Sequence, residues 1–224
     1  MDLKIKDVCA LLGIPEKTLV SWIKEGKIPA YDVRHQYFFN SAEIQEWVLK
    51  NKWPVSKNIL DMALTNIPVS LNKLLKKGGI AYGIKGHDAV QAITNSISVI
   101  NLPAGLDRQT LTSTLLEREE MMPTAMGKGI AIPHPRNPIV SDIENENVSL
   151  CFLEEGADFQ ALDGEKVTSM FIVLCANARR HLEILSRIAY LCQQEDFMAL
   201  IKKQACEKDL LEYIETKEKE WMKK

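Results

Sequence analysis

The periodicity of apolar residues changes repeatedly along residues 70–221, and this alternation constrains the fold more than any other feature. Ala89, Ile93 and Ile97 recur every four residues, which is typical of an amphipathic helix. Residues 148–153 form a nearly continuous apolar run, which is typical of a strand covered on both faces. The same criteria predict helices near residues 71–75, 106–118, 179–192, 197–203 and 209–221, and strands at 80–84, 130–132 and 170–174. We therefore predict an α/β fold in which helices sandwich a mixed sheet.

Residues 1–52 follow a different pattern and are expected to form a separate domain. Helical periodicity ends at Gly13 and resumes after Pro15 in a second helix. Aromatic residues are frequent in the segment 28–39 and predict a two-stranded wing. Capping-box spacing from Asn40 onward then predicts a third helix. This order of elements is that of a small winged helix-turn-helix domain.

A linker at residues 53–69 is expected between these two domains. Pro54 and Pro68 interrupt this segment and leave room for only one or two helical turns. The predicted organisation is therefore a helix-turn-helix domain at 1–52, the linker, and an α/β domain at 70–221.

Composition excludes several classes of protein. The net charge of −2 gives no overall signal for nucleic acid or membrane, and no apolar run reaches the roughly 20 residues that span a bilayer. The chain does not begin with the apolar segment of a signal peptide. Its five cysteines are odd in number and contain no Cys-x-x-Cys pair, which favours reduced thiols and a cytoplasmic location. The four histidines lie far apart in the sequence, so no metal site and no cofactor are predicted.

One histidine, His134, lies between two prolines and directly after the apolar run 130–132. The prolines disfavour a helix there, and Gly127 and Gly129 allow sharp turns of the backbone before the run. The imidazole is therefore expected to be presented from a rigid turn. Histidine is the side chain best suited to nucleophilic and proton-transfer chemistry near neutral pH, so His134 is a candidate reaction centre.

The surroundings of His134 resemble the phosphohistidine signature of a family of phosphoryl carriers. These are the enzyme IIA components of the bacterial phosphoenolpyruvate-dependent phosphotransferase system, of the fructose, mannitol and nitrogen-regulatory type. The resemblance is carried by Glu119, Met126, Gly127, Ile130, Ala131, Ile132, Pro133 and His134, and by the upstream segment Leu115–Glu119. One departure is Pro135, which stands where the family usually has Gly, Ala or Cys and which lacks a backbone N–H.

The resemblance implies a fold and a set of site residues. It implies an enzyme IIA type 2 fold for residues 70–221, with His134 as the phosphoryl acceptor through Nε2 and with Nδ1 bound to a backbone carbonyl. His181, followed by Leu182 at the start of a helix, matches a second active-site histidine of the family. Arg118 is expected to stabilise the charge of the phosphoryl group, and Thr124 to donate a hydrogen bond. Three neighbouring acidic residues are interpreted as solvated helix face or local capping: Glu117, Glu119 and Glu120.

The N-terminal segment resembles the DNA-binding modules of the excisionase and MerR type, through the run from Asp7 to Ala30. Its candidate DNA-contacting residues are Lys17, Lys24, Lys27, Arg34 and His35. Residues 1–57 contain nine lysines and arginines against seven acidic residues, a modest excess for a domain that binds phosphates. Dimerisation is therefore expected to be needed for useful affinity.

The sequence predicts a cytoplasmic regulatory phosphoryl carrier rather than a turnover enzyme. Its expected partners are the phosphocarrier protein HPr, double-stranded DNA, a regulatory protein target or enzyme IIB, and a second copy of the chain. Two alternatives stay open. The N-terminal domain of a carrier could mediate only protein contacts, or the IIA-like domain of a DNA-binding regulator could serve as a scaffold that is not phosphorylated.

Overall fold

The structure is a computed structural model that describes residues 3–33, 36–51, 68–140 and 142–221. The chain forms two compact units, Met1–Ile67 and Pro68–Lys224, which are described separately below. Residues 53–67 of the expected linker lie outside the described residues, so the domain limits stay a prediction. No described helix is both long enough and apolar enough to cross a membrane.

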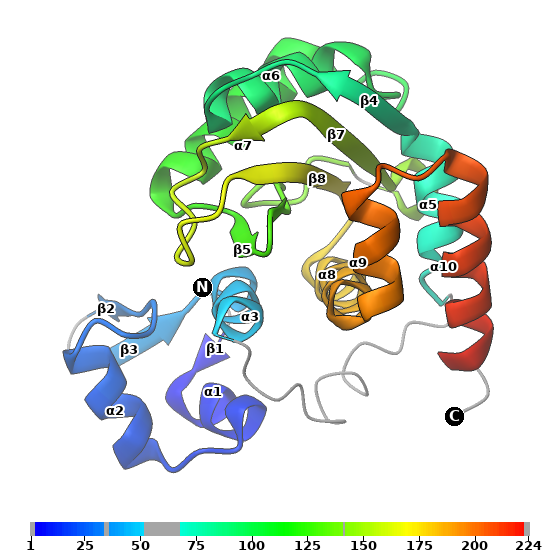
Figure 1. Ribbon diagram of the computed structural model, residues 1–224. Helices are drawn as coiled ribbons and strands as arrows, with labels where there is room; N and C mark the ends of the chain where they lie inside the picture. Colours follow the sequence, from blue (N-terminus) through cyan, green and yellow to red (C-terminus); the bar gives the residue numbers. More distant parts are fainter. Residues whose placement is uncertain (1–2, 34–35, 52–67, 141, 222–224) are drawn as a thin grey trace. The chain divides into compact units, whose positions relative to one another are not determined.

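The first unit combines helices with a small antiparallel sheet (Figure 1). Its described elements are β1 (Leu3–Lys4), α1 (Ile5–Leu12), α2 (Glu16–Lys24), β2 (Tyr31–Val33), β3 (Gln36–Phe39) and α3 (Ser41–Lys50). Strands β2 and β3 form the expected wing, and β1 adds to it by pairing Leu3 with Phe39. The order helix, turn, helix, wing, helix is thus confirmed, with one strand more than the sequence predicted.

Local interactions explain where these helices begin and end. The backbone N–H of Lys4 donates to Oδ2 of Asp7 at 2.8 Å, which starts α1, and Gly13 ends it in the left-handed conformation with φ of +67°. The carbonyl of Pro15 accepts from the backbone N–H groups of Thr18 and Leu19 and so starts α2. The side chains of Val8, Leu12, Leu19, Ile28, Phe39, Ile44, Trp47 and Val48 form the buried core of this unit.

The second unit is an α/β domain built on one mixed sheet (Figure 1). Its described strands are β4 (Ile80–Ile84), β5 (Ala125–Gly127), β6 (Ile130–Ala131), β7 (Asn147–Ala157) and β8 (Val167–Leu174). Its described helices are α5 (Leu71–Gly78), α6 (Ala89–Val99), α7 (Arg108–Met121), the 3-10 helix Ile143–Asn145, α8 (Ala178–Gln193), α9 (Glu195–Lys202) and α10 (Glu207–Trp221). The strand order is β4-β7-β8-β6-β5. Neighbours β4 and β7 are parallel, as are β6 and β8, whereas β7 pairs with β8 and β5 with β6 in the antiparallel direction.

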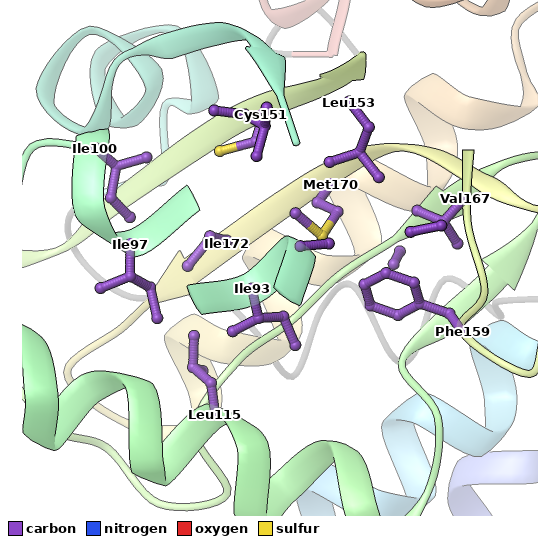
Figure 2. Packing of buried hydrophobic residues seen from close by; sticks show 14 of the residues in the cluster. Ile93, Ile97, Ile100, Leu115, Cys151, Leu153, Phe159, Val167, Met170 and Ile172 are labelled. Atoms are coloured by element: carbon purple, nitrogen blue, oxygen red, sulfur yellow. The ribbon is translucent and has the colours of Figure 1, made fainter. Parts of the chain in front are cut away.

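Helices cover both faces of this sheet, as the apolar runs predicted (Figure 1). On one face, Ile93 and Ile97 of α6 and Leu115 of α7 pack against Met170 and Ile172 of β8 (Figure 2). On the other face, α5 contacts β7 and α8 contacts β8. Because successive strand residues point to opposite faces, a central strand with both faces covered is apolar at nearly every position.

Several elements differ from the sequence prediction. Strand β7 continues to Ala157, β8 begins already at Val167, and the 3-10 helix was not predicted. Helix α7 continues to Met121 rather than ending at 118. Strand β5 was not predicted, because it is short and ends at Gly127, and because it exists only through its pairing with β6. Gly127, Lys128 and Gly129 all have positive φ, and this tight turn folds β5 back onto β6.

Candidate functional site

Two histidines meet at one edge of the mixed sheet. His134 follows β6, and His181 lies in the first turn of α8, which follows β8. Since β6 and β8 are neighbouring parallel strands, the segments that leave their carboxyl ends emerge at the same edge. The centroids of the two imidazole rings are 4.5 Å apart, and the ring planes are inclined by 47°. The structure thus brings together the two histidines that the sequence analysis singled out.

The turn that carries His134 is held by backbone hydrogen bonds on both sides. The N–H of Ile132 donates to the carbonyl of Thr124 at 3.1 Å, and the N–H of Val173 donates to the carbonyl of Pro133 at 3.0 Å. The ring atom Nδ1 of His134 lies 2.7 Å from the carbonyl oxygen of Ile132. A carbonyl only accepts, so Nδ1 carries the proton and Nε2 keeps its lone pair in the neutral ring.

Burial sets the charge state of His134, which is only 2% exposed. The pKa of His134 is lowered from 6.5 to about 4, mainly by desolvation and to a smaller extent by the charge of Arg118. The hydrogen bond to Ile132 and the carboxylate of Glu119 act in the opposite direction but do not outweigh these two causes. At neutral pH the imidazole is therefore uncharged.

His181 is fixed through the backbone of the first turn of α8. Its N–H donates to the carbonyl of Asn177 at 3.0 Å, and the Asn177 side chain caps the helix by accepting from the N–H of Arg180. The ring is 4% exposed, and its Nε2 has no hydrogen-bond partner among the described residues. Burial, then His134, then Arg118 hold the pKa of His181 well below its usual value.

Arg118 brings a permanent positive charge to this pair of histidines. It lies in the last turn of α7 and is 4% exposed. Its Nη1 donates to the carbonyl of Met122 at 2.6 Å, which fixes one side of the guanidinium. Its charge contributes to the lowered pKa of both His134 and His181.

Thr124 and Glu119 interact with each other beside this turn. Glu119 accepts from the backbone N–H of Thr124 at 3.0 Å and from its hydroxyl at 2.6 Å. A hydroxyl has one proton, so the predicted donation from Thr124 to a phosphoryl group requires it to leave Glu119. That role stays a prediction. Glu119 holds the segment after α7, which fits the interpretation as local capping, and Glu117 and Glu120 are exposed.

The candidate DNA-contacting residues belong to the first unit. Lys17 and Lys24 are exposed on α2 and lie seven positions apart, which places them on one face of that helix. Lys27 is exposed after α2 and pairs with Glu25 at 2.6 Å. Arg34 and His35 lie outside the described residues.

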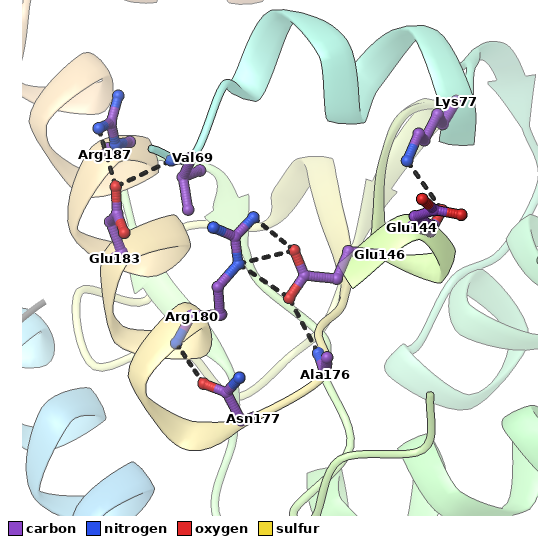
Figure 3. A network of polar contacts seen from close by, with 9 residues as sticks. All are labelled: Val69, Lys77, Glu144, Glu146, Ala176, Asn177, Arg180, Glu183 and Arg187. Carbon is purple, nitrogen blue, oxygen red and sulfur yellow. Dashed lines mark hydrogen bonds and ion pairs between the residues drawn. The ribbon is translucent and has the colours of Figure 1, made fainter. Parts of the chain in front are cut away.

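Sequence reasoning missed one feature of the site, a buried ion pair between Glu146 and Arg180 (Figure 3). The two residues are 34 positions apart, and no spacing rule links them. One sequence signal could have pointed to a buried charge. Arg180 directly precedes His181 at the start of a helix whose inner side is otherwise largely apolar. Within the described residues, no cluster of His, Cys, Asp or Glu side chains is placed to hold a metal ion.

A family model described as "Phosphoenolpyruvate-dependent sugar phosphotransferase system, EIIA 2" matches residues 73–217, which is more than half of the chain. The chain belongs to this family. A second model, described as a helix-turn-helix domain, matches residues 3–52. The second unit is therefore called the IIA domain below, and the first unit the helix-turn-helix domain.

Known proteins resemble the IIA domain in sequence and in fold. A nitrogen regulatory protein of Pseudomonas aeruginosa is 32% identical over 132 residues, which cover 57% of this chain and 83% of that protein. The fructose-specific EIIABC component of Bacillus subtilis is 26% identical over 154 residues, which cover 67% of this chain but only 24% of that longer protein. The crystal structure of nitrogen regulatory protein IIA-Ntr from Neisseria meningitidis superimposes with a TM-score of 0.54 at 22% identity, covering 64% of this chain and 97% of that one. The last likeness confirms the fold.

Proposed function

We propose that this protein is a regulatory phosphoryl carrier of the phosphotransferase system. HPr transfers a phosphoryl group to Nε2 of His134, and the helix-turn-helix domain binds double-stranded DNA. The observation that carries the proposal is the geometry of His134: Nδ1 donates to the carbonyl of Ile132 at 2.7 Å, and the ring lies 4.5 Å from that of His181. In this arrangement Nε2 carries no proton, so it can act as the nucleophile and needs no base to activate it.

The chemistry follows from the charges around the two rings. A bond forms between phosphorus and Nε2 of His134 while the bond between phosphorus and the donor atom breaks, and the electron pair of that bond leaves with the donor. Because His134 is neutral at pH 7, no proton has to be removed before the attack. The negative charge of the transferring group is spread over three oxygens, and Arg118 offers a fixed positive charge to them. His181 faces the acceptor ring from the first turn of α8.

The names of the relatives support a regulatory role within this system. One is called a nitrogen regulatory protein, and another is the fructose-specific EIIABC component of a transport system. We propose that phosphorylated His134 passes its phosphoryl group to enzyme IIB or signals to a regulatory protein. The match to a helix-turn-helix family and the exposed Lys17 and Lys24 on one face of α2 support DNA as a further partner, bound by a dimer in the cytoplasm.

A phosphotransfer assay tests the proposal. The full-length protein is incubated with phosphoenolpyruvate, enzyme I and HPr, and the expected product carries an acid-labile, alkali-stable phosphate. His134→Ala is expected to abolish labelling while the circular dichroism spectrum stays unchanged. Full labelling of that variant excludes His134 as the acceptor, and no labelling of the wild-type protein leaves the IIA domain as a scaffold.

A second candidate function for the N-terminal domain is protein contact alone. The pairing of Lys27 with Glu25 favours it, since a lysine that is neutralised by a neighbouring carboxylate contributes less to phosphate binding. Titration with genomic DNA fragments at two salt concentrations separates the two. DNA binding that weakens in Lys17→Gln/Lys24→Gln supports the DNA-binding role, and the absence of binding at low salt supports protein contact.

A further inference from the structure

We infer that the buried ion pair between Glu146 and Arg180 positions His181 against His134, and that it is a positioning device for phosphoryl transfer. This inference rests on the proposed function of His134. It concerns residues that take no part in the bonds made or broken during the transfer.

The pair is unusually well enclosed and well connected. The side chain of Arg180 is 3% exposed and that of Glu146 is fully buried. Nε of Arg180 donates to Oε1 and Oε2 of Glu146 at 3.1 and 2.9 Å, and Nη2 donates to Oε2 at 2.6 Å (Figure 3). This two-point contact fixes the direction of the guanidinium as well as its distance, because both groups are planar.

Glu146 holds both sides of the turn that leads into α8. Its Oε1 also accepts from the backbone N–H of Ala176 at 3.0 Å, two residues after β8 ends. Glu146 itself stands directly before β7, and the next residue, Asn147, pairs with Leu174 of β8. The carboxylate therefore ties the end of β8 and the first turn of α8 to the start of β7.

The position of the His181 ring depends on the backbone of the first turn of α8. Its Nε2 has no hydrogen-bond partner among the described residues, so no hydrogen bond at that atom fixes the ring. The imidazole is carried by the first turn of α8, which is held by the cap at Asn177 and by the ion pair of Arg180. A shift of that turn moves the ring relative to His134, which lies only 4.5 Å away between centroids.

A contribution to the stability of the fold does not by itself explain why an ion pair is buried at this position. Replacement of a buried ion pair by well-packed apolar groups is often neutral or stabilising, because desolvation offsets much of the attraction between the charges. What the pair supplies here is a defined direction and distance between β7 and α8. Phosphoryl transfer to His134 is expected to be sensitive to the place of His181, since a displacement of about 1 Å can lower a rate by roughly 100-fold.

The same helix offers a matched control. Glu183 and Arg187 also pair on α8, with Oε1 of Glu183 2.9 Å from Nη2 of Arg187 (Figure 3). Glu183 also accepts from the backbone N–H of Val69 at 3.1 Å, at the entry of the IIA domain rather than at the turn before His181. Arg187→Gln therefore breaks an arginine–glutamate pair of α8 without touching the turn that carries His181.

The experiment uses the full-length protein and compares Glu146→Gln/Arg180→Met, Arg180→Lys and Arg187→Gln. Phosphoryl uptake is measured over a range of HPr concentrations, and the ring signals of His181 are recorded by NMR on histidine-labelled protein. The double variant leaves no charge buried at the pair, and Arg180→Lys keeps the charge but loses the planar fork. Both are expected to lower the maximal rate roughly 10- to 100-fold with an unchanged KM for HPr and to shift the His181 signals. Arg187→Gln is expected to leave rate and signals at their wild-type values.

The possible outcomes separate the inference from the function on which it rests. Wild-type rates and unshifted His181 signals in a folded double variant overturn the inference. If the double variant does not fold, the same two measurements on Arg180→Lys decide. If the wild-type protein takes up no phosphate on His134, the proposed function fails, whereas the NMR comparison still shows whether the pair positions His181.

Discussion

At the scale of single residues, burial and one backbone carbonyl define the chemistry of His134. The carbonyl of Ile132 selects the tautomer with the proton on Nδ1, and enclosure in the domain lowers the pKa to about 4. Arg118 adds to this effect, so the guanidinium that we propose to stabilise the phosphoryl group also favours the uncharged ring of His134. A neutral ring with its proton on Nδ1 and a nearby positive charge are thus compatible.

The pKa of His134 predicts a specific pH dependence. Between about pH 4 and 6.5 the unfolded chain binds a proton at this residue that the folded chain does not, so the free energy of unfolding falls as the pH falls through this window. The contribution amounts to about 3 kcal/mol at pH 4 relative to pH 7. NMR of the ring nitrogens is expected to show His134 neutral and protonated at Nδ1 down to pH 5. A midpoint near 6.5 in the folded protein contradicts this prediction.

The position of Arg118 leads to a prediction about the rate of phosphoryl acceptance. Arg118→Ala is expected to slow phosphoryl acceptance by roughly 10²- to 10³-fold, because removal of one preorganised charge-stabilising donor has effects of that size. The control is Arg108→Gln, an arginine of the same helix that donates to the carbonyls of Ile97 and Ile100 instead. Rates are measured with HPr in excess. A wild-type rate in Arg118→Ala means that another group stabilises the phosphoryl charge.

At the scale of elements, close packing against the sheet decides where α5 can lie. Gly78 ends this helix against β7, and its carbonyl accepts from the hydroxyl of Ser149 at 3.0 Å. A Cβ atom at position 78 would lie 2.3 Å from the carbonyl oxygen of Val148, closer than any stable contact. Because that oxygen belongs to the backbone of a central strand, it cannot move without shifting the sheet.

Gly78→Ala is therefore expected to destabilise the IIA domain by about 1–3 kcal/mol, the usual effect of overpacking a rigid site. Urea unfolding followed by circular dichroism measures the change. Lys76→Ala is the control, since it introduces the same residue at an exposed position of the same helix and is expected to stay within about 0.5 kcal/mol of wild type. Equal midpoints for the two variants contradict the close approach of α5 to β7.

At the scale of the whole molecule, a IIA domain and a helix-turn-helix domain share one chain. A phosphoryl group adds about −1.5 to −2 charges at pH 7. DNA is a polyanion, so the added charge opposes its binding, and salt screens the effect.

Phosphorylation at His134 is therefore expected to weaken DNA binding by the full-length protein at low salt and to have less effect at high salt. Titration of DNA fragments with phosphorylated and unphosphorylated protein at two salt concentrations measures this difference. His134→Ala, treated with the same phosphoryl donors, is expected to show no change. Equal affinities with and without phosphate at low salt mean that the two domains act independently.

The sequence alone determined those features that depend on neighbours along the chain. The proline-flanked turn at His134, the apolar runs of β7 and β8 and the helix-turn-helix order all follow from local sterics and periodicity, and the structure confirms them. Tertiary structure decided what depends on the order of strands: the existence of β5, the approach of His181 to His134 across 47 positions of sequence, and the buried pair of Glu146 with Arg180. The physical reason for the last two is that they join segments which meet at one edge of a mixed sheet. Which segments share that edge is set by strand pairing, and strand pairing is not encoded in the spacing of any single segment.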